Sequence, residues 1–212
     1  MSQRPLALTL FAVTALSLAL VALSAQLTNG FTRWTFEALR RDAAATGRLS
    51  APAVPLRTAN GVTGTPWPSD THTVYLVDFI YTQCLTICQA LGGEYTRLQR
   101  QLRARFGAHS PVRLVSVAFD RKHDTPTELQ AYARRHHADD ALWLIGTPAS
   151  AQAADTLLQA LGVVAVPDGL GGFVHNGAIH LIDSHGTVRG IYDLDQWPQA
   201  LERALQLTGT PT

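Results

Sequence analysis

The sequence contains little cysteine and little charge. Of its 212 residues, two are cysteines and 16% are charged, and the formal net charge at pH 7 is +1. Because binding to phosphates requires clustered lysine and arginine, this balance argues against nucleic acid as a partner. Internal repeats and low-complexity tracts are also lacking. A hydrophobic content of 46% predicts a globular protein with a substantial core.

One long apolar run lies near the N-terminus. Pro5–Ala25 comprises 21 residues without a charge, enough for a helix that crosses a membrane. Because the run exceeds the apolar part of a usual signal peptide, we predict an uncleaved single-pass anchor; cleavage near Ala22-Leu23-Ser24 is the alternative. A short N-terminal tail normally stays in the cytosol. We therefore expect the rest of the chain outside the cytosol, in the periplasm if the cell is Gram-negative.

The composition divides the chain into three regions. We predict an anchor at 1–26, a stalk and linker at 27–52 and a folded domain at 53–212. The stalk includes a short amphipathic helix, Thr35–Ala45. The linker around Ser50–Pro55 is rich in proline, which keeps it extended.

The folded domain alternates strands with helices. Strands are expected at Thr73–Tyr81, Arg113–Phe119, Leu142–Gly146, Gly177–Asp183 and Val188–Asp193. Four helices are expected. The first carries an apolar stripe from Leu91 to Phe106 and the second begins at Pro126; the third runs from a cap at Thr147-Pro148 to Gly162, and the last spans Pro198–Leu207. This order predicts an α/β, thioredoxin-like sandwich in which helices flank a central mixed β-sheet.

The two cysteines, Cys84 and Cys88, lie four residues apart after the first buried strand. Residues i and i+4 share one face of a helix, so both sulfurs would point at the same place. A helix N-terminus also stabilises thiolate, the form that binds soft metals or attacks disulfides. We predict a reactive dithiol here. Inert core cysteines are the alternative, as is a structural disulfide, which would close too short a loop to stabilise much.

A soft site with two thiolates favours a third donor, and imidazole suits copper. His180 is assigned to a strand and His185 to a hairpin turn. Five other histidines fall in predicted turns or polar helix ends, where exposure is expected: His72, His109, His123, His136 and His137. His175 directly precedes the strand Gly177–Asp183. In a thioredoxin-like fold the loop that enters this strand faces the cysteine loop, so we predict His175 as the third ligand.

Three segments form a specific combination. They are Val77–Cys88 with its C-x₃-C pair, Ser116–Asp120 with Asp124-Thr125-Pro126, and Val174-His175-Asn176. Together they resemble the Sco/SenC family of membrane-anchored, thioredoxin-like copper-binding proteins, over about Asn60–Leu207 plus the anchor. The resemblance implies a copper chaperone that binds one copper, as Cu(I) and/or Cu(II), through Cys84, Cys88 and His175. It also implies delivery toward the copper centre of cytochrome c oxidase.

The chain departs from the family pattern at two positions. Proline commonly follows each cysteine, whereas Leu85 and Gln89 stand here. These changes spare the predicted ligands and indicate a divergent member. The partners implied are a copper-receiving oxidase subunit or another copper chaperone, together with an external thiol reductant that keeps the dithiol reduced.

The main alternative function is an extracytoplasmic thiol-disulfide oxidoreductase that uses Cys84 and Cys88 without metal. That function leaves His175 unexplained, and dedicated oxidoreductases generally carry C-x-x-C. A structural zinc site would need four protein ligands, and three are evident. The roles of Asp120 and Asp124 stay open between contact with a partner and ending a strand or adjoining a helix cap.

Overall fold

The computed structural model describes residues 4–58, 60–62, 64–69, 72–84, 87–169 and 171–209. The chain divides into two compact units, Met1–Asp42 and Ala43–Thr212.

The first unit is dominated by one long helix. Helix α1, Arg4–Leu27, is long and apolar enough from Leu6 onward to cross a membrane, a test that a signal sequence also meets. Its apolar side chains are exposed, as for Phe11 and Leu16, which suits a helix that faces lipid. Helix α2, Phe36–Ala45, begins where the stalk helix was predicted, because the hydroxyl of Thr35 accepts a hydrogen bond from the N–H of Ala38 at 3.1 Å.

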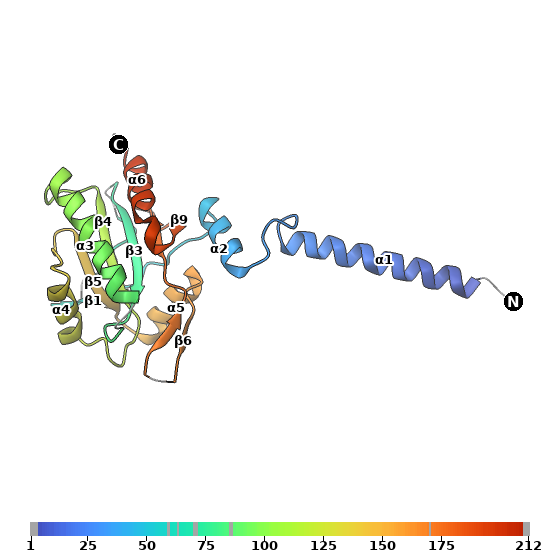
Figure 1. Cartoon of the computed structure of the whole chain (residues 1–212), viewed down its shortest axis with the longest axis horizontal. Coiled ribbons are helices and arrows are strands. Elements are labelled where there is room, and N and C mark those ends of the chain that lie inside the picture. Colours follow the sequence, from blue (N-terminus) through green and yellow to red (C-terminus); the bar gives the residue numbers. More distant parts are fainter. Residues whose placement is uncertain are drawn as a thin grey trace. The chain divides into compact units, whose positions relative to one another are not determined.

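The second unit is built on a seven-stranded mixed sheet with the order β2-β1-β5-β4-β3-β8-β9 (Figure 1). The strands are β1 Leu56–Thr58, β2 Gly61–Val62, β3 Val74–Ile80, β4 Val112–Ala118, β5 Trp143–Pro148, β8 Ile179–Ile182 and β9 Val188–Tyr192. Strands β3, β4 and β5 are parallel, while β8 and β9 continue the sheet in antiparallel fashion.

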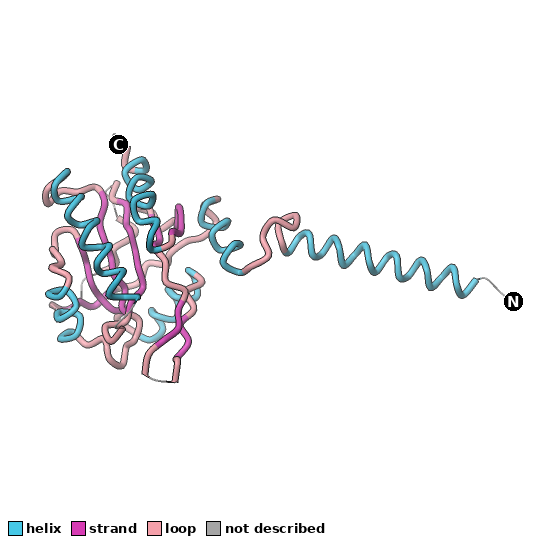
Figure 2. Tube along the Cα trace, viewed as in Figure 1, coloured by secondary structure: helices cyan, strands magenta, loops and turns pink. Residues whose placement is uncertain are grey.

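Helices flank this sheet (Figure 2). They are α3 Ile87–Phe106, α4 Pro126–Arg135, α5 Ala151–Leu161 and α6 Trp197–Leu207, the last preceded by the short 3₁₀ helix η1, Leu194–Gln196. Trp143 of β5 contacts Tyr95 of α3 and Tyr132 of α4, so these two helices cover the same face. The arrangement confirms the predicted α/β architecture of a mixed sheet flanked by helices.

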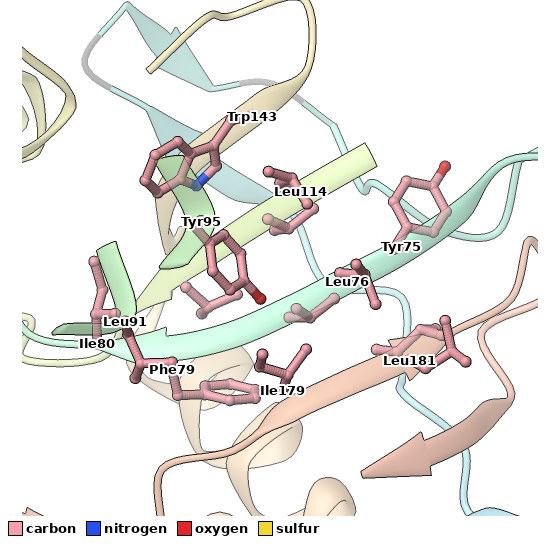
Figure 3. Close-up of a cluster of buried hydrophobic side chains, with 14 of the residues drawn as sticks. Tyr75, Leu76, Phe79, Ile80, Leu91, Tyr95, Leu114, Trp143, Ile179 and Leu181 are labelled. Carbon is pink, nitrogen blue, oxygen red and sulfur yellow. The ribbon is translucent and has the colours of Figure 1, made fainter. Parts of the chain in front are cut away.

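The core lies between β3, β4 and the helices. Every residue of β3 is buried, because the strand has neighbours on both edges and both faces. Most of the predicted helical stripe is also buried, with Leu91, Tyr95, Leu98 and Leu102 at most 1% exposed. Figure 3 shows Tyr95 and Trp143 above the strands that carry Leu76 and Leu114.

Two local predictions are wrong. Thr147-Pro148 does not cap a helix: both residues belong to β5, where they pair with Arg57 and Leu56 of β1. The cap of α5 is Ser150, whose hydroxyl accepts from the N–H of Ala153 at 3.1 Å.

The second wrong prediction is the loop that we expected before His175. It is an antiparallel ribbon of β6, Ala165–Pro167, and β7, Phe173–His175. Strands of three residues around a glycine-rich turn are too short for a period-2 pattern to emerge.

Candidate metal centre

Strand pairing brings the cysteine segment and His175 to one end of the sheet. Val77 of β3 lies opposite His180 of β8, and the two strands are antiparallel. The carboxyl end of β3 therefore lies beside the amino end of β8. Cys84 follows the first of these ends and His175 precedes the second.

Tyr81 connects the two segments. Its carbonyl accepts a hydrogen bond from the N–H of Cys84 at 3.1 Å. Its hydroxyl lies 3.4 Å from the N–H and 3.5 Å from the carbonyl of Phe173 in β7. The centroids of its ring and the His175 imidazole are 6.2 Å apart, and Phe119 at the end of β4 lies 5.3 Å from the same imidazole. Two aromatic rings thus hold His175 beside the turn that carries Cys84.

Cys84 is buried, at 2% exposed, in a turn that precedes α3. The helix begins at Ile87, so Cys88 lies in its first turn while Cys84 lies before it. The prediction that both cysteines share one helical face is therefore wrong for Cys84. Leu85 and Thr86 lie outside the described residues, and so does the side chain of Cys88. That a helix N-terminus favours a thiolate at Cys88 therefore stays a prediction.

Gln89 makes a contact that a proline could not. Its side-chain amide donates to the carbonyl of Cys84 at 3.1 Å. This bond ties the Cys84 turn to the first turn of α3. The departure from the family pattern at this position thus replaces a rigid φ angle with a hydrogen bond.

The predicted donors match the chemistry of copper. Burial lowers the pKa of His175 below the usual value for histidine, so its imidazole is neutral at neutral pH, the form that coordinates metals. Thiolate and neutral imidazole are donors that suit copper. Among the side chains that the structure describes, no group of three or more His, Cys, Asp or Glu lies close enough to hold an ion. Cys88, the remaining predicted donor, is outside that set.

Two other histidines are buried. His180 is 0% exposed and lies edge-on to Phe79 at 5.3 Å, which confirms its assignment to the sheet. The predicted exposure of His136 is wrong, since it is 8% exposed. Its ring packs on Gly92 of α3, where a Cβ atom would come within 2.4 Å of it. Gly92 thus makes room in α3 for the side chain of the residue that caps the end of α4.

Asp124 is a positioning residue that the sequence did not reveal. One carboxylate oxygen accepts from the N–H and the hydroxyl of Thr82, each at 2.7 Å, and the other accepts from the N–H of Asp120 at 2.7 Å. Burial raises the pKa of Asp124 to about 6, against the opposing effect of these hydrogen bonds. Asp124 thus fastens the segment two residues before Cys84 to the end of β4.

Asp120 is also turned inward. It is buried, and one of its oxygens lies 2.6 Å from Nδ1 of His123. The helix cap is Thr125, whose hydroxyl accepts from the N–H of Glu128 at 3.3 Å. The role of Asp124 leaves no signal in the sequence, because its partner Thr82 belongs to another segment.

Replacing Asp124 with alanine should lower the free energy of unfolding by about 2–4 kcal/mol, because two buried N–H groups lose their acceptor. Alkylation of Cys84 should also become faster as its turn loosens. Denaturant unfolding and thiol-labelling rates measure these effects. The exposed Asp140→Ala variant serves as the control and should match the parent. If Asp124→Ala and the parent are labelled at the same rate, the hydrogen bonds of Asp124 do not hold the Cys84 turn.

The model of the SCO1/SenC family matches residues 69–208. The chain belongs to the SCO1/SenC family. It is 30% identical over 122 residues to the SCO1 protein homolog of Bacillus subtilis (strain 168), a match that covers 57% of this chain and 62% of that relative. The match thus spans less than two thirds of the relative's length.

Solved Sco structures share the fold. BsSco, described as having a disulfide switch and as a member of the Sco family of cytochrome c oxidase assembly proteins, gives a TM-score of 0.64 at 20% identity, covering 77% of this chain and 95% of that one. Copper-bound ScoI of Bradyrhizobium japonicum gives 0.59 at 20% identity, covering 74% and 99%. At these identities the likeness shows the fold, and it confirms the predicted thioredoxin-like sandwich.

Proposed function

We propose that this protein is a copper chaperone that binds one copper through Cys84, Cys88 and His175 and delivers it to the copper centre of cytochrome c oxidase. The observation that carries the proposal is the position of His175, which Tyr81 and Phe119 hold beside the Cys84 turn. Membership of the SCO1/SenC family supports it. So do the copper bound by the ScoI relative and the oxidase-assembly description of the BsSco relative.

Copper is the cargo of such a protein, and the residues around the site prepare the donors. Burial keeps His175 neutral and ready to coordinate. Gln89 and Asp124 hold the Cys84 turn from two sides, through its carbonyl and through Thr82. Two thiolates and one imidazole leave a position at which a partner's donor enters, so cargo passes by exchange of ligands one at a time. An external thiol reductant keeps the pair reduced.

The first test is metal stoichiometry. The reduced full-length protein in detergent should retain one copper per chain after loading and desalting, as elemental analysis measures. Protein with alkylated cysteines and a Cys84→Ser/Cys88→Ser variant should retain none, because imidazole alone does not hold the ion. If the double variant retains as much copper as the parent, the two cysteines are not copper ligands.

We propose that α1 remains as a single-pass anchor and that the region from about Ala53 onward is extracytoplasmic. Protease added to intact spheroplasts should therefore digest this region, because the membrane does not shield it. A cytosolic marker protein serves as the control and should survive. Digestion that begins only after lysis would reverse the orientation.

A further inference from the structure

The ribbon of β6 and β7 carries an unusual exposed surface. Among the described residues of the unit Ala43–Thr212, the exposed large hydrophobic side chains are three valines: Val164, Val166 and Val174, at 49%, 53% and 69%. All three belong to the ribbon or its entry. Figure 1 shows this ribbon projecting from the rest of the second unit.

The three valines lie on one face. Val166 pairs with Val174 across the ribbon, and Val164 precedes Val166 by two residues. Because side chains alternate along a strand and paired residues share a face, all three point the same way. Phe173 and His175 alternate to the other face, where Phe173 lies 5.3 Å from the ring of Tyr81 and 5.4 Å from that of Phe119. One ribbon thus presents a valine face outward and the predicted ligand inward.

Hydrogen bonds at both ends hold the ribbon in shape. At its base, the side chain of Asn176 accepts from the N–H of Val164 at 2.7 Å and donates to the carbonyl of Gly162 at 2.9 Å. At its tip, the carboxylate of Asp168 accepts from the N–H of Gly172 at 2.9 Å. The valine face is therefore preorganised, which reduces the entropy lost when another molecule binds it.

We propose that the valine face (Val164, Val166 and Val174) is the docking surface for the protein that exchanges copper with this site, an inference that rests on the proposed function. Ligand exchange requires the partner's donors to reach His175. Val174 is its neighbour on β7 but faces the other way, so a partner seated on the valine face reaches the ligand around the edge of the ribbon. A partner with a small apolar patch beside its own metal ligands fits both features. Burial of the exposed valines stabilises the complex with the partner, while the exchange of ligands moves the copper.

Charge and size favour this occupant over two others. From Leu161 to Ile182 the sequence has no lysine or arginine, and its one acidic residue is Asp168, so the ribbon does not attract an anionic membrane surface. Three partly exposed valines offer at most a few hundred Å², well below the roughly 800 Å² per partner of a stable interface. A permanent dimer is therefore disfavoured, and a transient encounter is the expected mode.

The test measures copper transfer from full-length protein in detergent to the copper-free soluble domain of the oxidase subunit that carries the copper centre. A Val166→Lys/Val174→Lys variant should transfer about tenfold more slowly, because two charges enter the apolar contact. Its transfer to a small copper chelator should equal that of the parent, since a chelator needs no docking face. A Gln101→Lys/Gln130→Lys variant adds the same charge at exposed positions of α3 and α4 and should behave like the parent.

The outcomes separate the two proposals. If the parent fails to hold copper or to pass it to the subunit domain, the proposed function is wrong and this docking role is lost with it. If the parent and the valine variant transfer copper at the same rate, only the docking proposal is overturned. Two further results would also overturn the docking proposal. A transfer defect of the variant that is seen only in lipid vesicles would indicate a membrane contact. A dimer that the parent forms and the variant does not would indicate self-association.

Discussion

A His175→Ala variant should lose copper far more readily than the parent, by at least the roughly 10–100-fold that even outer-shell changes cause in metal sites. Two thiolates without the imidazole leave the metal under-coordinated. Competition titration with a copper chelator measures this change. Reduction of a model disulfide by the same variant should change much less, because thiol-disulfide exchange needs a thiolate and a resolving cysteine and no imidazole.

The control for this experiment should be an exposed histidine. His180 is fully buried, so its removal would also damage the core. His185 is exposed in the turn between β8 and β9, and His185→Ala should retain copper like the parent. Normal copper binding by His175→Ala together with a collapse of disulfide reduction would favour the oxidoreductase and reject the chaperone.

The second large effect concerns Asp78, a carboxyl group at the centre of β3. It is 0% exposed, and burial raises its pKa to about 7, with Ser116 on β4 lowering it in part. No hydrogen bond of ordinary geometry reaches either oxygen from the described residues. The fold therefore favours the protonated form of Asp78.

The sign of the pH dependence follows from this shift. With the folded pKa raised to about 7 from a usual 3.8, the contribution of Asp78 to stability is complete below about pH 4. It is lost as pH rises through about 7, and the ionised group then costs up to about 4 kcal/mol. An Asp78→Asn variant stays neutral at nearly the same size. It should be more stable than the parent at about pH 8, with the advantage shrinking toward about pH 5.

Thermal unfolding of both proteins across this range measures the difference, in which the other titrating groups cancel. Asp195→Asn removes an exposed carboxylate on η1 and serves as the control for the loss of one carboxylate. A constant difference between Asp78→Asn and parent at all pH values would mean that Asp78 keeps one charge state throughout.

The sequence by itself determined the elements whose signals are local. The uncharged run of α1, the β-branched run of β3 and the stripe from Leu91 to Leu102 each follow from spacing within one segment, because burial of a face imposes a fixed period. The placement of the two cysteines at the junction of a strand and a helix followed in the same way. So did the assignment of His180 to the sheet.

The tertiary structure decided everything that depends on two distant segments. Asp124 connects the segments that follow β3 and β4 because these strands end side by side. His136 is buried because Gly92 leaves space for its ring on another helix. The pairing of Val166 with Val174 gathered three valines on one face, which neither three-residue strand could reveal separately. Contacts of this kind arise from chain packing, so no periodicity within one segment encodes them.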